Sequence, residues 1–399
     1  MRPRIKHNEN LVSPMEFFAT CKIGLESLVS GELKELGIEV TAVHDARVDF
    51  SGSYTDMAVA LTYLRTAERV LMQVGSFEAT SFEQLYEGVR AIEWKNYINK
   101  NNFIHVTGKS AKSKLFSVSD CQRISKKAIV DSLASAYGIK ILPENGKRII
   151  IEIGILRDVV TVALDCCGAG LSRRGYRTYN VSAPISETLG AAIVLLSGYR
   201  AERPFLDPMC GSGTMPIEAA MIATNTAVGL NRSFAAEDWH FMRENAFELA
   251  RERARDCVKA DSFDITGSDI DAHSIDLCKK HAKKAGVMLS WRVASVLDLR
   301  EERSGGVLCC NPPYGERLME KRDAEKLYRG MHEVFSRLDG WSVNIIASHP
   351  EFERVYGQRA DKRRKLSNGG MVCTLYRYYP KYSQGRDRVR VEIENERKE

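Results

Sequence analysis

The sequence predicts an α/β protein in which an α+β segment precedes an open, doubly wound sheet. Two observations support this prediction. Apolar patterns between Phe17 and Val74 follow the order βαββαβ, and in the second half short apolar strands alternate with helices and end in polar turns. With 399 residues, of which 44% are apolar, the chain is long enough for about two or three domains with their own cores.

The first segment is predicted to be a small ferredoxin-like unit. Apolar residues alternate from Phe17 to Ile23, which predicts a strand, and recur at helical spacing from Leu25 to Leu36, where Gly37 ends the helix. Strands at residues 40–43 and 47–50, a helix at residues 54–64 and a strand at residues 69–74 complete the ferredoxin-like order.

A basic loop and a basic helix follow in the next α+β segment. After a predicted helix at residues 82–92 and a strand at residues 103–107, the loop from Gly108 to Lys114 carries three lysines. The helix behind it begins at the capping-box spacing of Ser119 and Gln122 and carries three more cations on one stripe. We expect all six to share one RNA-binding surface, a solvated helix face being the alternative: Lys109, Lys112, Lys114, Arg123, Lys126 and Lys127. A hairpin at residues 148–156 and 159–165 closes the segment.

A glycine-rich and charged junction, from Gly168 to Arg177, separates the two halves of the chain. Its arginines, Arg173, Arg174 and Arg177, are expected either to touch a phosphate backbone or to be solvated. A helix is predicted to open at Ser182 and Pro184 and to end at Gly198.

A glycine turn follows the short strand at residues 203–206. The residues from Asp207 to Thr214, Asp-Pro-Met-Cys-Gly-Ser-Gly-Thr, lie between that strand and a helix, where glycines let the backbone approach a ligand closely. Pro216 stands where a dinucleotide fingerprint has its third glycine, and no Gly-Lys-Ser/Thr is present. The turn therefore favours a ligand other than a dinucleotide or ATP, and Asp207 suits one with a cationic amino group. A structural glycine turn is the alternative.

Two further acids follow strand ends. An irregular insertion and a helix at residues 243–259 precede the strand at residues 263–267, after which Asp269 is placed to accept ribose hydroxyls and Asp271 to cap the next helix. Asp298 follows the strand at residues 291–293 and could accept from an exocyclic amine such as that of adenine, or be an ordinary surface acid.

The tetrapeptide Asn311-Pro312-Pro313-Tyr314 follows the apolar run from Gly306 to Cys310, which predicts a buried parallel strand. An amide oxygen on Asn311 and the carbonyl of Pro312 can accept both N–H groups of a planar amine, and Tyr314 offers a face for stacking. A Pro-Pro turn without function is the alternative. Strands at residues 343–347 and 371–379 follow, with a basic run at residues 359–365 between them that either meets nucleic acid or forms a solvated loop.

The bulk composition adds little about partners. A formal charge of +6 and a pI near 8.7 are compatible with a polyanionic partner. The ten cysteines show no Cys-x-x-Cys spacing, so we expect reduced thiols in a cytoplasm and no metal. No signal peptide or membrane-spanning run is visible.

Two resemblances accompany these patterns. The stretch from Phe103 to Gly138 resembles the THUMP domain, an RNA-binding module, in its strand, lysine-serine loop and basic helix. The second half, with its motifs in the order given, resembles class I S-adenosylmethionine-dependent methyltransferases that act on amino groups. The longer matches at residues 207–214 and 311–318, with Glu237-Asp238-Trp239 in the insertion, look like the RlmL-type guanine-N2 methyltransferases of 23S rRNA.

The resemblance implies a seven-stranded mixed methyltransferase sheet, with the last strand antiparallel, behind a ferredoxin-like segment and a THUMP domain. The expected domains are residues 1–66, 67–168 and 169–385, with a charged tail at residues 386–399. The cofactor is expected to be S-adenosyl-L-methionine, and the partner RNA, in particular 23S rRNA or its precursor. The residues expected to bind the cofactor are Asp207, Pro208, Cys210, Gly211, Ser212, Gly213, Thr214, Asp269 and Asp298.

The expected reaction is attack of a flipped guanine's N2 amino group on the sulfonium methyl group. Asn311, Pro312, Pro313 and Tyr314 hold the base. Since no covalent nucleophile is required, the thiols of Cys210, Cys309 and Cys310 are assigned to packing. Three alternatives stay open: a tRNA guanine-N2 methyltransferase, a protein glutamine-N5 methyltransferase and a non-catalytic RNA-binding protein.

Overall fold

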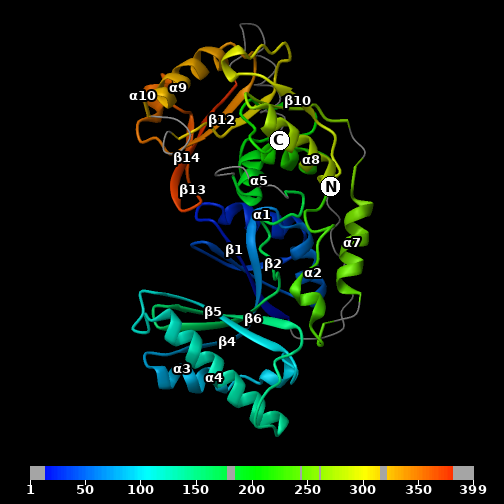
Figure 1. The fold of residues 1–399 in the computed structure, drawn as a ribbon, viewed down its shortest axis with the longest axis vertical. Helices are drawn as coiled ribbons and strands as arrows, with labels where there is room; N and C mark the ends of the chain where they lie inside the picture. Colours follow the sequence, from blue (N-terminus) through cyan, green and yellow to red (C-terminus); the bar gives the residue numbers. More distant parts are fainter. Residues whose placement is uncertain (1–13, 178–184, 243–244, 260–261, 315–320, 381–399) are drawn as a thin grey trace, which may run out of the picture. The chain divides into compact units, whose positions relative to one another are not determined.

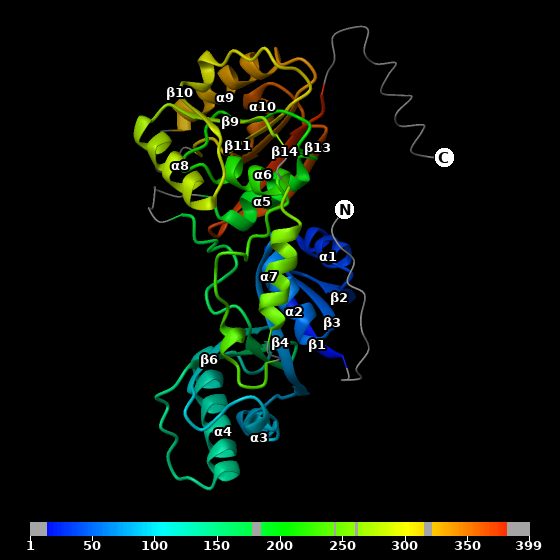
Figure 2. The same cartoon turned by 90° about the vertical axis from the view of Figure 1, so that its right-hand side faces the viewer.

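The computed structural model describes residues 14–177, 185–242, 245–259, 262–314 and 321–380. The chain forms two compact units (Figures 1 and 2). Unit 1 comprises Met1–Cys21, Glu26–Leu171 and Val228–Asp256, and unit 2 comprises Lys22–Leu25, Ser172–Ala227 and Cys257–Glu399. The insertion at Val228–Asp256 therefore groups with the N-terminal part of the chain.

The first part of unit 1 has the predicted βαββαβ order. Its elements are β1 (Met15–Cys21), α1 (Glu26–Glu35), β2 (Glu39–His44), β3 (Arg47–Gly52), α2 (Tyr54–Tyr63) and β4 (Ala67–Glu78). Ser53 caps α2, and its hydroxyl and Asp56 form a reciprocal capping box. The strands lie in the order β2-β3-β1-β4, so the ferredoxin-like prediction is confirmed.

The second part of unit 1 extends the same sheet. It contains α3 (Phe82–Arg90), the short helix η1 (Trp94–Asn96), β5 (Phe103–Ala111), α4 (Val118–Tyr137), β6 (Arg148–Leu156) and β7 (Val159–Asp165). The twelve-residue strand β4 pairs with β1 on one side and β7 on the other, which gives one seven-stranded sheet in the order β2-β3-β1-β4-β7-β6-β5. The predicted hairpin at residues 148–165 is confirmed.

Two local predictions in this part are wrong. β5 continues to Ala111, so Lys109 lies on a strand and the loop begins only at Lys112, because a parallel pairing with β6 extends along all of β5. Helix α4 begins at Val118 with Ser117 as its N-cap residue, so Ser119 and Gln122 form no capping box. The hydroxyl of Ser117 donates to Asp120 at 2.6 Å.

The insertion contributes η2 (Ala235–Asp238) and α7 (Ala246–Asp256), and α7 packs against α2. The N–H of Gly229 donates to the carbonyl of Thr62 at 2.8 Å, and Phe234 stacks on Phe247. The insertion is therefore part of the fold of unit 1.

Unit 2 contains a second seven-stranded sheet in the order β10-β9-β8-β11-β12-β14-β13. In chain order its elements are α5 (Glu187–Leu196), β8 (Phe205–Asp207), α6 (Thr214–Ala223), β9 (Ile265–Asp269), α8 (Ala272–Ala285), β10 (Ser290–Val293), η3 (Val296–Asp298), β11 (Val307–Cys310), α9 (Lys321–Phe335), β12 (Ser342–Ala347), α10 (Phe352–Tyr356), β13 (Lys362–Asn368) and β14 (Met371–Tyr378). β14 is antiparallel to β12, which confirms the mixed sheet with an antiparallel last strand.

The interpretation of residues 359–365 as a loop is wrong. Most of this basic run forms the edge strand β13, which pairs with β14 from Lys362 to Asn368. Cations on an edge strand oppose pairing with a further strand, which explains the composition without a nucleic acid.

Two of the three junction arginines, Arg174 and Arg177, pair with acids inside unit 2, whereas Arg173 is exposed. The side chain of Arg174 is 1% exposed and pairs with the fully buried Glu218, which also accepts from the hydroxyl of Tyr176. Arg177 donates to Glu187 at 2.8 Å. Since Arg174 and Arg177 are held by these acids, the expectation that they touch a phosphate backbone or are solvated is wrong for both.

Some predictions fall outside the described residues. They are the helix start at Ser182 and Pro184, motif residues 315–318 and the charged tail. Within the described ranges, no helix has the length and apolarity needed to span a membrane.

Candidate active site

The candidate site lies where the strand order of the second sheet reverses. β8 pairs in parallel with both β9 and β11, whereas the chain passes from β8 to β9 to β10 on one side and continues at β11 on the other. Ligands of open α/β sheets bind at the carboxyl ends of the strands at such a switch point. The glycine turn follows Asp207 at the end of β8, and the other turn begins at Asn311, after β11. β8 and β11 are paired, so the two turns start about 5 Å apart.

The glycine turn after β8 is rigidly held. Gly211 and Gly213 have φ of 51° and 83°, in the left-handed region that favours glycine. Cys278 of α8 donates its Sγ–H to the carbonyl of Gly211 at 3.1 Å. Nδ1 of His281, also from α8, lies 3.0 Å from the carbonyl of Ser212 and donates to it. The turn is therefore shaped before any ligand binds.

Asp207 is a buried carboxyl group with one oxygen unused. Its Oδ1 accepts from the N–H of Met209 at 3.1 Å, while its Oδ2 has no hydrogen-bond partner among the described residues. Burial, with Asp269 as a smaller contribution, raises the pKa of Asp207 well above its ordinary range. An unpartnered buried carboxyl oxygen fits a ligand with a cationic amino group, as the sequence predicts.

Asp269 connects the ends of β8 and β9. Its Oδ2 accepts from the N–H of Gly211 at 2.9 Å and its Oδ1 from the N–H of Asp271 at 3.0 Å. Each carboxylate oxygen keeps a further lone pair, so the group is oriented and still able to accept from ribose hydroxyls. Asp271 caps α8 by accepting from the N–H groups of His273 and Ser274, which confirms its predicted role.

Two apolar residues that sequence reasoning missed accompany these acids. Asp298 is exposed at the end of η3, beyond β10, as expected. Ile270, directly after Asp269, is 75% exposed, and Leu297, directly before Asp298, is 47% exposed. Exposed apolar groups beside two acceptors suit a planar ring with polar edges. Both residues could have been found from the sequence, because each is an apolar residue directly next to a predicted site acid.

The tetrapeptide at the end of β11 has an internal hydrogen bond. The hydroxyl of Tyr314 donates to Oδ1 of Asn311 at 2.6 Å, and Cys373 contacts the same hydroxyl at 3.7 Å. Burial raises the pKa of Tyr314, so its hydroxyl stays protonated. The amide oxygen of Asn311 therefore has one lone pair engaged and one available.

The carbonyl groups of Pro313 and Pro312 differ in their hydrogen bonding. The hydroxyl of Tyr328, from α9, donates to the carbonyl of Pro313 at 2.6 Å. No residue in the described ranges donates to the carbonyl of Pro312. That carbonyl and the second lone pair of Asn311 are thus the two acceptors that remain for an amine.

The cysteines near the site are not activated. Burial raises the pKa of both Cys309 and Cys310, and contact with Cys278 and burial raise that of Cys210. All three thiols are protonated and buried, which fits packing. None of the ten cysteines forms a disulfide. Within the described part of the chain, no cluster of His, Cys, Asp or Glu has a metal-binding arrangement.

The six cations expected to bind RNA lie in unit 1 but do not form one cluster. Lys109 pairs with Glu152, Arg123 with Asp120, and Lys126 with Glu144. Lys126 also lies over the ring of Phe103, at the start of β5, whereas Lys112 and Lys114 follow its end. Nine strand residues separate these positions by about 26 Å. Lys127 lies 5.9 Å from the ring centre of Tyr86.

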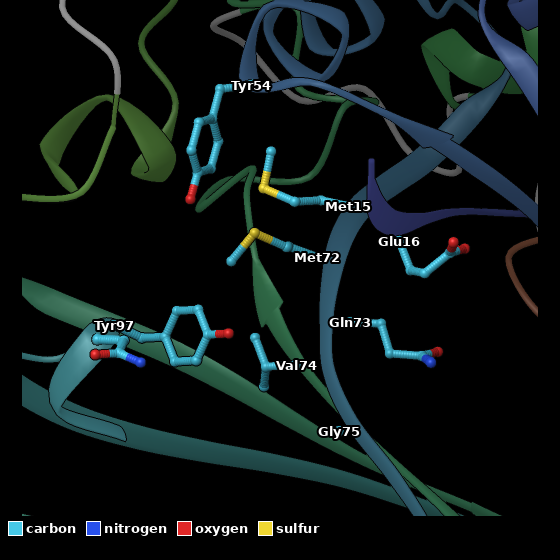
Figure 3. A pocket seen from close by; sticks show the side chains of 9 residues that line it. Met15, Glu16, Tyr54, Met72, Gln73, Val74, Gly75 and Tyr97 are labelled. Atoms are coloured by element: carbon cyan, nitrogen blue, oxygen red, sulfur yellow. The ribbon is translucent and has the colours of Figure 1, made fainter. Parts of the chain in front are cut away.

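A separate cavity of about 520 Å³ lies in unit 1 and contains none of the predicted site residues (Figure 3). Its lining residues are Met15, Glu16, Tyr54, Met72, Gln73, Val74, Gly75, Asn96 and Tyr97. In the close-up, Tyr54, Tyr97 and the two methionines lie on one side of β4, and Glu16 and Gln73 on the other. The lining combines methionine and tyrosine side chains with the polar side chains of Glu16, Gln73 and Asn96.

Family models match three consecutive parts of the chain. An RlmL ferredoxin-like domain matches residues 16–71, a THUMP domain matches residues 79–165, and an RMKL-like methyltransferase domain matches residues 174–377. The methyltransferase match spans both turns of the candidate site and more than half of the chain. The protein belongs to the RlmL-type THUMP methyltransferase family. Its domain order and the mixed sheet of its methyltransferase domain are those the sequence predicts.

The matches to similar proteins cover almost the whole of this chain. "Putative RNA methyltransferase YpsC" of Bacillus subtilis (strain 168) is 41% identical over 368 residues, 91% of this chain and 95% of that protein. A crystal structure described as that of a predicted N6-adenine-specific DNA methylase from Listeria monocytogenes str. 4b F2365 is 42% identical with a TM-score of 0.87, covering 92% of this chain and 97% of that one.

A third similar protein is described with a bound ligand. The structure described as "SMU.472, a putative methyltransferase complexed with SAH" is 38% identical with a TM-score of 0.88. The match covers 94% of this chain and 100% of that one. The RlmL-type methyltransferase family depends on S-adenosylmethionine. The unpartnered oxygen of Asp207 and the preformed glycine turn fit this cofactor.

Proposed function

We propose that this RlmL-type methyltransferase transfers a methyl group from S-adenosylmethionine to the exocyclic N2 amino group of a guanine in 23S rRNA. The main support is the position of Asn311, Pro312 and Tyr314 directly after β11, which pairs with β8, the strand that precedes the glycine turn. Two acceptors beside an aromatic ring suit a planar amine, and a cofactor held by the neighbouring turn brings its methyl group to that amine.

On the cofactor side, each residue has a proposed contact. The turn from Asp207 to Thr214 holds the methionine part, with Oδ2 of Asp207 accepting from the cationic amino group. Asp269 accepts from the ribose hydroxyls. Asp298 accepts from the adenine amine, with Ile270 and Leu297 against the ring. The bound cofactor supplies an already activated methyl group, so no metal or covalent nucleophile is required.

On the substrate side, the acceptors orient the amine. The amide oxygen of Asn311 and the carbonyl of Pro312 accept its two N–H groups, which directs the nitrogen lone pair at the methyl carbon. Tyr314 and the rigid Pro312-Pro313 backbone fix the plane of the base. The base must leave its stack to reach this position, as in other enzymes that act on a base.

The first half of the chain supports RNA as the substrate. The THUMP match includes all six predicted RNA-binding cations, and the B. subtilis relative is named as an RNA methyltransferase. The name given to the Listeria relative favours a second candidate, adenine N6 in DNA. The N6 group of adenine is also a planar amine, so Asn311 and Pro312 suit it equally well and only the substrate assay separates the two.

The experiment offers labelled S-adenosylmethionine with unmodified 23S rRNA, tRNA, DNA and ribosomal protein in parallel reactions. We expect label in 23S rRNA, recovered after digestion as N2-methylguanosine. Label recovered as N6-methyladenine from DNA, or in tRNA or protein alone, overturns the proposed substrate. Asn311→Ala is the matched control, because it removes an acceptor and leaves the cofactor turn intact.

A further inference from the structure

An exposed apolar row lies at one end of the first sheet, in unit 1. Ala111 of β5 is paired with Leu156 of β6, which is paired with Val159 of β7, so the three side chains lie next to one another across the strands. Leu156 is 57% exposed and Val159 40% exposed. Phe116, in the loop that leaves β5, is 82% exposed. We call Ala111, the loop Lys112–Phe116 and the hairpin residues Leu156–Val159 the hairpin-end surface.

The loop is held against the hairpin by hydrogen bonds. The N–H of Lys114 donates to Oδ1 of Asp158 at 2.7 Å, and the N–H of Asp158 donates to the hydroxyl of Ser113 at 3.1 Å. The N–H of Arg157 donates to the carbonyl of Ala111 at 3.3 Å. Within the loop, the side chain of Leu115 is buried, and its carbonyl accepts from the hydroxyl of Ser110. The loop therefore presents Phe116 outwards while its own backbone is fixed.

The same surface carries cations without acid partners. Lys112, Lys114 and Arg157 are exposed, and no described acid forms an ion pair with any of them. This contrasts with Lys109, which Glu152 neutralises at 3.0 Å. The carboxylate of Asp158 is engaged by the backbone of Lys114. The positive charge of the hairpin-end surface is thus available to a polyanion.

We propose that the hairpin-end surface binds unpaired nucleotides of the RNA substrate, with one base stacked on Phe116 and its flanking phosphates bound by Lys112, Lys114 and Arg157. The inference rests on the proposed RNA substrate. A stacked base inside a duplex offers no free face to an aromatic ring, whereas an unpaired base does. Leu156 and Val159 extend the apolar surface for a neighbouring sugar or base.

A fluorescence anisotropy titration tests the proposal with two probes, a single-stranded RNA and a blunt duplex of equal phosphate number. Phe116→Ala should weaken binding of the single strand by about 5- to 150-fold, the range measured for loss of one stacked base. It should leave duplex binding unchanged. Phe116→Tyr should restore single-strand binding, because the tyrosine ring also stacks.

Ile141 provides the matched control. It is 83% exposed after α4, outside the hairpin-end surface. Ile141→Ala should bind both probes as the unchanged protein does. Equal affinity of Phe116→Ala and the unchanged protein for the single strand, or an equal loss with both probes, overturns the stacking role.

The charge contribution has its own readout. Changing Lys112, Lys114 and Arg157 to Gln together should reduce the slope of log affinity against log salt by about 2 for the single strand. An unchanged slope removes the three cations from the contact. If the unchanged protein methylates no RNA and binds neither probe, the proposed function itself fails, and this result differs from a loss confined to Phe116→Ala.

Discussion

Asp269 and Asp271 provide a sharp test of cofactor binding, because they are two residues apart and each accepts two backbone N–H groups. Only Asp269 is proposed to contact the ribose. Its bonds to Gly211 at 2.9 Å and Asp271 at 3.0 Å orient the carboxylate and shape the glycine turn. Asp269→Ala removes the proposed ribose contacts and loosens the turn, so we expect the cofactor to bind more weakly by about 1.5–3 kcal/mol, or roughly 10- to 150-fold.

Calorimetric titration with S-adenosylhomocysteine measures this loss, and thermal unfolding of the ligand-free protein measures stability. Asp271→Ala removes the N-cap of α8, so it should lower the unfolding temperature and leave the affinity unchanged. The reasoning is refuted if Asp269→Ala binds the ligand as tightly as the unchanged protein, or if both variants lose affinity equally.

Three further predictions concern the amine site, the buried acid and the cations. Tyr314→Phe keeps the ring and releases Oδ1 of Asn311, so single-turnover methylation should be retained or up to about tenfold faster; a loss as large as that of Tyr314→Ala would contradict this. Burial raises the pKa of Asp207 in the folded protein, so the stability contributed by its protonated form is fully present below the unfolded-state pKa and is lost as pH rises through the folded-state pKa. At pH 8, Asp207→Asn should therefore unfold at a higher temperature than the unchanged protein, and a lower unfolding temperature would refute this stability prediction. The same variant should bind the cofactor more weakly. Charge reversal of Lys112 and Lys114 should weaken RNA binding more than reversal of Lys109 and Lys126, which Glu152 and Glu144 already neutralise; filter binding giving the opposite order would contradict this.

The strands and helices that position the site could be predicted because their patterns are local. The runs that became β8 and β11 are followed by prolines, and α6 begins directly after the glycine turn, so these signals mark the element ends in the sequence. The helix cap at Asp271 follows from the same short-range rules. The residues of both turns were therefore found without structural information.

The edge strand β13 could not be found in this way. Its residues Lys362 to Lys365 are all cationic, and an edge strand needs little apolar pattern because one side is open to water. The ion pairs of Lys109 and Lys126 were also invisible, since their partners Glu152 and Glu144 are 43 and 18 residues away in the chain. Long-range pairing of this kind has no sequence signal in a single chain.

The hydrogen bond from Tyr314 to Asn311 was missed for a different reason. The sequence identified each residue by its chemistry, the ring for stacking and the amide for accepting. It could not show that the phenol hydroxyl reaches the amide oxygen, because that depends on the turn made by the two prolines and on Cys373 beside the hydroxyl.

The central claim is that the amide oxygen of Asn311 orients the target amine during methyl transfer. The most direct test is the single-turnover rate of Asn311→Ala with saturating RNA and S-adenosylmethionine, so that binding and product release do not limit the rate. We expect the rate to fall by about 10²- to 10³-fold with cofactor affinity unchanged, and Asn311→Asp, which also accepts, to retain part of the activity. An unchanged rate in Asn311→Ala would contradict the proposed mechanism.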